Sequence, residues 1–164
     1  MFNKLMSSLG LQGIQVDGRL HTTAPQAGQA IQGEVIFKGA ASNKIINGIY
    51  LKLMTTAEVE TDDAEYNSAL SIAEWHISGA FELQAHQSHA FPFSMQLPFE
   101  TPITDVPCRL NKTRVWLHTH LDVDWGLDAT DKDYLQILPT PAMQVFIQAM
   151  QQCGFQLMTV DVEQ

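Results

Sequence analysis

The stretch of sequence that decides the fold is FPFSMQLPFETPIT, at residues 91–104. Its apolar side chains recur at every second position, which is the period of a β-strand with one buried face: Phe91, Phe93, Met95 and Leu97. Pro92 has no amide hydrogen to donate, so we expect it at the start of a strand or in an edge strand. Pro98 and Pro102 then end the strand.

The same alternation recurs on both sides of this stretch. It predicts further short strands over residues 14–20, 31–38, 45–59, 69–76, 79–84, 115–123 and 134–138. A polar, acidic segment at residues 61–68 predicts a loop between two of them. Many short strands with turns at this spacing are typical of an antiparallel, immunoglobulin-like β-sandwich, which we expect to span residues 13–139.

Two segments have the period of a helix instead. At the amino end, apolar residues spaced i, i+3, i+4, i+7 predict a short helix over residues 1–12: Phe2, Leu5, Met6 and Leu9. We expect this helix to dock on its own domain or on a neighbour. A peripheral tether to a membrane or a partner by residues 1–10 is the weaker alternative, since this segment has one Lys and few turns.

The second helical segment lies near the carboxyl end. Thr140 is a suitable N-cap and Pro141 suits the first helical position, while Gly154 predicts the end of the helix. One apolar stripe follows this amphipathic helix: Met143, Phe146, Ile147 and Met150. Alternation after residue 154 predicts a final strand. We expect residues 140–164 to pack on the sandwich or to lead to a missing second domain.

Composition narrows the classes of partner. The 164 residues contain 9 Lys+Arg and 18 Asp+Glu, a formal charge of −9, which disfavours nucleic acid and anionic membrane surfaces. No apolar run approaches the length of a membrane span. Cys108 and Cys153 form no CxxC pair, so we expect free thiols and a cytoplasmic protein. No phosphate-binding loop or nucleophile motif is present, and we expect no cofactor and no catalytic residue.

One polar row has the residue types of a metal site. Four side chains of the strand at residues 115–123 and its end share one face: His118, His120, Asp122 and Asp124. His-x-His on a strand can bind zinc if a carboxylate or a neighbouring strand completes the site. The alternative is a solvent-facing row opposite the apolar one.

Trp116 precedes these residues on the same outward face. A large aromatic side chain there either marks an interface or is covered by the carboxyl-terminal helix. If the apolar stripe of that helix does not pack on its own domain, it forms a surface for a partner. The interface candidates are therefore Trp116, Met143, Phe146, Ile147 and Met150.

Four segments, in this order and spacing, resemble one known family. They are PQAGQAIQGEV at residues 25–35, INGIYLKLMTTAEVE at 46–60, FPFSMQLPFETPIT at 91–104 and RVWLHTHLDVDWGLDATDKDYLQILPTPAMQ at 114–144. The match is to the amino-terminal half of the bacterial sporulation-control proteins, which have an arrestin-like fold and usually two sandwich domains. The resemblance implies an arrestin-like sandwich in a cytosolic regulatory or scaffold protein, without catalytic residues.

The sequence therefore predicts a non-enzymatic regulatory protein that acts through protein–protein interaction. The alternative, from another class, is a metal-binding protein or metal-dependent enzyme that uses His118 and His120. Sandwiches have exposed sheet edges, so we also expect a homodimer through an edge strand or the carboxyl-terminal helix.

Overall fold

The computed structural model describes residues 13–60 and 65–163. The predicted helix over residues 1–12, and the tether proposed for residues 1–10, lie outside the described residues. The elements are β1 (Gln15–Leu20), β2 (Ala30–Lys38), β3 (Lys44–Glu60), β4 (Glu65–Ser78), β5 (Phe81–Leu83), β6 (Ser88–Gln96), β7 (Cys108–Asn111), β8 (Val115–Val123), β9 (Ala129–Leu135), α1 (Pro141–Gln152) and β10 (Leu157–Val160).

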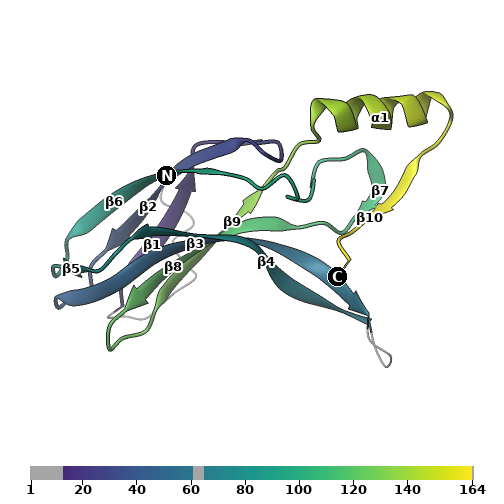
Figure 1. The fold of residues 1–164 in the computed structure, drawn as a ribbon. Coiled ribbons are helices and arrows are strands. Elements are labelled where there is room, and N and C mark those ends of the chain that lie inside the picture. Colours follow the sequence, from purple (N-terminus) through teal and green to yellow (C-terminus); the bar gives the residue numbers. More distant parts are fainter. Residues whose placement is uncertain (1–12, 61–64, 164) are drawn as a thin grey trace.

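Two antiparallel sheets form the sandwich (Figure 1). The smaller has the order β1-β2-β6, and the larger has the order β4-β3-β8-β9 with β5 paired to the start of β3. The predicted antiparallel sandwich is confirmed. One pair departs from it, because β7 and β10 run parallel to each other in a separate two-stranded sheet.

The stretch around Phe93 behaves as its alternation predicts. Phe93, Met95 and Leu97 are buried in the core between the sheets, and Phe91 packs against that core from a half-buried position. Pro92 lies in β6, which among the described strands pairs only with β2 and is therefore an edge strand of its sheet. The missing amide hydrogen of Pro92 therefore leaves the interior of the sheet intact.

Strand β8 supplies the opposite wall of the core. Its inward residues are all nearly or fully buried: Val115, Leu117, Thr119, Leu121 and Val123. They pack with inward residues of the central strand β3, including Ile49, Leu51 and Leu53, which are 0% exposed. Alternation thus predicted the buried face of both strands correctly.

Two predicted boundaries were wrong. Strand β4 begins at Glu65, inside the segment predicted as a loop, because residues 65–68 continue the antiparallel ladder with the end of β3. The strand predicted over residues 134–138 is β9, which begins at Ala129. Its first residues pair with β8 although Asp131 and Asp133 suggest a turn by composition.

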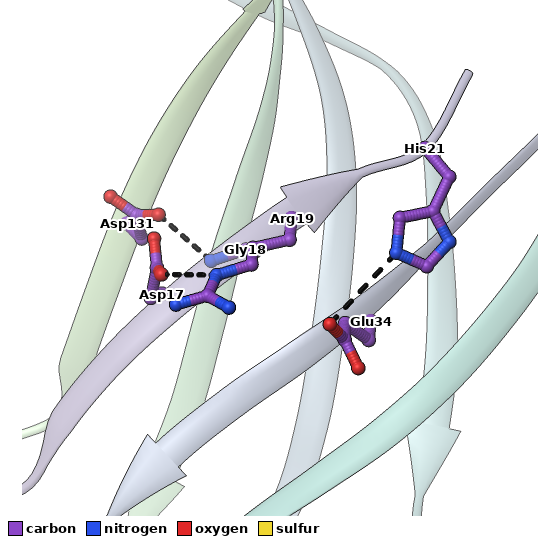
Figure 2. Close-up of polar contacts among 6 residues, drawn as sticks. All are labelled: Asp17, Gly18, Arg19, His21, Glu34 and Asp131. Atoms are coloured by element: carbon purple, nitrogen blue, oxygen red, sulfur yellow. Dashed lines mark hydrogen bonds and ion pairs between the residues drawn. The ribbon is translucent and has the colours of Figure 1, made fainter. Parts of the chain in front are cut away.

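Strands β1 and β9 close one side of the sandwich. The Gly18 amide donates to Asp131 Oδ2 at 2.9 Å across this seam (Figure 2). A Cβ at residue 18 would lie 2.8 Å from Thr119 Oγ1 and from Asp133 Oδ2, so a side chain there would push the two strands apart. Glycine is therefore what allows β1 to approach the larger sheet so closely.

Candidate interaction surface

The predicted polar row of β8 lies on the outer face of the larger sheet. The register places His118 between Lys52 of β3 and Lys132 of β9, and His120 between Tyr50 and Thr130. Burial lowers the pKa of His118, and the positive charges of its neighbours lower it further. Because cations flank His118, this part of the row suits a neutral imidazole better than a bound metal cation.

Two other members of the row, His120 and Asp122, have partners of their own. His120 Nε2 lies 3.0 Å from Asp128 Oδ2, and its ring stacks on Tyr50. Asp122 Oδ1 accepts a hydrogen bond from Asn47 Nδ2 at 3.1 Å. Within residues 13–60 and 65–163, no group of three or more His, Cys, Asp or Glu side chains is placed to hold a metal ion. The structure does not bring the four predicted ligands together.

Trp116 is covered by its own sheet. It is only 7% exposed, because Lys132 Nζ lies 3.9 Å from the ring centroid and the Tyr134 ring packs beside it. The predicted alternative cover, the carboxyl-terminal helix, buries none of its own residues. Trp116 therefore presents little surface to a partner in this conformation.

The carboxyl-terminal helix has the predicted ends. The Met143 amide donates to Thr140 Oγ1 at 3.4 Å, and Pro141 occupies the first turn. At the other end, the Phe155 amide donates to Met150 O and the Gly154 amide to Gln151 O, with Gly154 at a φ of 85°. This is the Schellman arrangement, in which glycine adopts the left-handed conformation at low cost.

Helix α1 is held by the segments at its two ends. Before it, the Leu138 amide donates to Pro25 O, and Gln26 Nε2 donates to Pro139 O at 2.9 Å. After it, β10 pairs with β7. Figure 1 shows α1 at one end of the molecule, on the far side of the β7–β10 pair from the larger sheet. The helix is thus positioned without packing into the core.

As a result, several apolar residues of α1 and of the following turn and strand are exposed. We call this group the C-terminal surface, and its exposed members are Met143, Val145, Phe146, Met150, Phe155, Leu157 and Met158. Ile147, the fourth residue of the predicted stripe, is partly buried. No Asp, Glu, Lys or Arg occurs between Asp133 and Asp161, so α1 and β10 themselves carry no such side chain. Exposed apolar patches of this kind mark interaction sites on folded proteins.

Sequence reasoning found only part of the exposed apolar surface. Phe155, Leu157 and Met158 were placed in a strand by alternation, but which of them faces solvent depends on the parallel pairing with β7. Trp125 and Leu127 were missed entirely as surface features, although they are 97% and 93% exposed. The sequence does carry a signal for them, since both flank Gly126 in a short turn between two well-patterned strands.

A comparison with models of protein families assigns the chain to a family. The model described as SpoOM protein matches residues 2–164 of the chain. The chain belongs to the Spo0M family. A curated Spo0M relative, the sporulation-control protein spo0M of Bacillus subtilis (strain 168), is 33% identical over 163 residues, which are 99% of this chain and 61% of that protein.

A solved Spo0M structure supports the fold. The crystal structure of Spo0M, sporulation control protein, from Bacillus subtilis superposes with a TM-score of 0.85 at 31% identity. The match covers 93% of this chain and 60% of the other. The arrestin-like fold implied by the sequence resemblance is confirmed. The chain spans about three-fifths of the length of the Spo0M proteins it matches.

Proposed function

We propose that this chain is a non-enzymatic regulatory module of the cytoplasm, which acts by binding proteins through the C-terminal surface. The observation that carries the proposal is the exposure of Phe146 at 69% and Val145 at 68% on a helix that its own caps and flanking segments hold in place. The Bacillus subtilis relative is named for sporulation control, which favours a regulatory role for this chain as well.

The energetics favour a binding surface. Full burial of a large apolar side chain is worth about 1.5–3 kcal/mol, so a partner that covers several of these residues gains a substantial free energy. The helix is already formed and capped, so a partner does not have to order it on binding. Preformed helices with an apolar stripe typically dock in a hydrophobic groove, with anchors at positions such as Met143, Phe146 and Met150.

The other interface candidates have secondary roles in this proposal. Ile147 is partly buried, so it offers a partner less surface than the exposed residues of the stripe. Trp116 lies on the outer face of the larger sheet under Lys132, and it contributes to binding only if that lysine is displaced. We therefore place the docking site on α1 and β10.

A photo-crosslinking amino acid at position 146 tests the proposal in cells that express the full chain. We expect partner proteins to be crosslinked from position 146, and to be lost when Met150 and Met158 are both replaced by Ser. The matched control carries the same amino acid at position 32, since Gln32 is also exposed but lies on β2, the middle strand of the smaller sheet. Equal crosslinking from both positions, or none from position 146, would contradict the proposal.

Self-association is the second part of the proposal, and two surfaces suit it. One is the C-terminal surface. The other is β4, which among the described strands pairs only with β3, and which contains no proline, lysine or arginine that would discourage pairing with another strand. An antiparallel pair of β4 strands would extend the larger sheet across a two-fold axis.

A further inference from the structure

A cavity of about 320 Å³ lies where β8 begins and β9 ends, and we call it the β8–β9 cavity. Its volume is near the lower limit for small-molecule pockets in proteins, which span about 300–1,000 Å³. The lining combines apolar side chains with hydroxyl groups and one cation. The described residues that line it are Thr104, Thr113, Arg114, Val115, Tyr134 and Leu135.

Arg114 is the charged member of this lining. Its Nη1 donates to Asn111 O at 3.2 Å and to Thr113 O at 2.9 Å, and these bonds fix the guanidinium beside the cavity. Within residues 13–60 and 65–163, Nε and Nη2 of Arg114 have no hydrogen-bond partner, and the guanidinium is not ion-paired. A guanidinium donates from these two nitrogens in a planar fork that matches the two oxygens of a carboxylate.

Two hydroxyl groups accompany the guanidinium. Thr113 is 2% exposed, and its Oγ1 has no hydrogen-bond partner among the described residues. Native proteins normally give a buried hydroxyl a partner, because leaving it without one costs free energy. A ligand oxygen beside Thr113 would supply that partner. Tyr134 brings a second hydroxyl, on a ring that is 60% exposed.

The wall of the cavity is held in place by hydrogen bonds around Asn111. Asn111 Nδ2 donates to Thr104 O at 2.6 Å, and its Oδ1 accepts from the Thr113 amide at 2.9 Å. On the other side, Thr55 Oγ1 of β3 donates to Arg114 O at 3.0 Å. The lining residues are therefore positioned before a ligand binds, and binding orders few groups.

The carboxylates that neighbour the lining in sequence are engaged elsewhere. Asp133 and Tyr134 lie on opposite faces of β9, because successive side chains of a strand alternate. Asp133 Oδ2 lies on the side of Gly18 of β1, where a Cβ would be 2.8 Å from it. Asp105 Oδ2 accepts from Gln136 Nε2 at 3.1 Å. The formal charge in the described lining is therefore positive, although the chain as a whole carries −9.

We propose that the β8–β9 cavity binds a monocarboxylate with an apolar body. The Arg114 guanidinium pairs with the carboxylate, and the hydroxyls of Thr113 and Tyr134 donate to its oxygens. The apolar body packs on the Tyr134 ring beside Val115 and Leu135. One cation balances one negative charge, whereas a phosphate group carries nearly two. The net charge of the chain repels every anion, and a dianion more strongly, so we expect millimolar affinity for a monoanion.

An NMR titration of the full chain with phenylacetate tests the proposal, because this probe joins a carboxylate to an apolar ring. We expect saturable shifts of the amide signals of Thr113, Arg114 and Leu135. Phenylacetamide has the same shape without the charge and should cause no saturable shift. N-acetylphenylalaninate presents the carboxylate as the end of a peptide. Tighter binding of this probe than of phenylacetate assigns the site to peptide ends, and weaker binding assigns it to free small molecules.

Variants identify the groups that hold the carboxylate. Arg114→Met should weaken phenylacetate binding by about tenfold or more, and Arg114→Lys should weaken it less, because lysine keeps the charge and loses the planar fork. Tyr134→Phe keeps the ring and should weaken binding by about two- to tenfold. Lys44→Met is the matched control. It also removes one positive charge, but Lys44 begins β3 at the opposite end from Thr55, so this variant should bind like the parent.

Four results would overturn the proposal: no saturable shift with phenylacetate, equal binding of phenylacetamide, tighter binding of inorganic phosphate, or unchanged affinity in Arg114→Met. If Arg114→Met does not fold, Arg114→Lys and Tyr134→Phe decide, and parental affinity in both contradicts the proposal. The lining contains no residue of α1 or β10, so these results do not bear on the proposed function of the C-terminal surface.

Discussion

The sandwich core and the C-terminal surface are both built from regularly spaced apolar residues, yet the fold treats them in opposite ways. Leu117 of β8 and Leu51 of β3 are 0% exposed between the two sheets. Phe146 of α1 is 69% exposed, and no residue of its helix is buried. The difference lies in what faces each apolar side. Strand β8 has a second sheet opposite it, whereas α1 is held by its ends beside the sandwich.

The comparison shows that periodicity identifies an apolar face without identifying what covers it. In a sandwich, each sheet covers the other, so the inward faces of β6 and β8 are explained by the same core. A helix attached outside that core has no such counterpart within the described residues. The proposed binding role rests on this lack of cover, and the caps around α1 explain how the helix keeps its form without it.

The largest expected effect comes from the core. Leu117→Ala leaves a cavity between the sheets and should lower the free energy of unfolding by about 2–5 kcal/mol. Chemical denaturation followed by tryptophan fluorescence measures this change. Leu127→Ala is the matched control, because it removes the same atoms from a side chain that is 93% exposed. A comparable loss of unfolding free energy in Leu127→Ala would contradict the contrast between covered and uncovered residues.

A smaller effect is expected at the seam that closes the sandwich. Asp131→Ala removes the acceptor of the Gly18 amide and should cost about 1–3 kcal/mol, the penalty for a partly buried donor left without a partner. Thermal unfolding at neutral pH measures the loss. Asp131→Asn keeps an acceptor oxygen and should recover most of the stability; if it is as unstable as the alanine variant, the carboxylate charge matters more than the hydrogen bond.

A still smaller effect concerns pH. Burial and the nearby positive charges lower the pKa of His118 in the folded protein, whereas in the unfolded chain it stays near 6.5. The unfolded state therefore binds more protons, and stability falls as pH decreases from about 7 through the lowered pKa. His118→Gln should flatten this decrease in denaturation curves recorded across the range. A His118→Gln profile as steep as that of the parent would contradict this account.

Much of the fold was predictable because the relevant signals are local. The buried faces of β6 and β8 follow from alternation, and the ends of α1 follow from Thr140, Pro141 and Gly154. The early starts of β4 and β9 were not predictable from composition, because the first residues of both strands are polar. These residues adopt strand structure because they pair with β3 and β8. Pairing between distant segments overrides local preference in sheets.

The candidate site was predictable only in its residue types. The stripe of Met143, Phe146 and Met150 follows from helical spacing, but its exposure depends on where β10 pairs. The polar row of His118 and His120 suggested a metal site. Only the register of the strands shows that Lys52 and Lys132 lie on either side of His118. The strained, exposed Trp125 has no periodic signal at all.

The smallest expected effect gives the most direct test of the central claim, that α1 presents its apolar stripe to a partner instead of to its own domain. The measurement is the free energy of unfolding of the Phe146→Ser, Met150→Ser double variant in dilute solution, compared with the parent. Since both residues are exposed, we predict a change within about 0.5 kcal/mol, as for surface substitutions in general. A loss of about 2 kcal/mol or more, the cost of truncating buried side chains, would show that the stripe belongs to the core and would contradict the account.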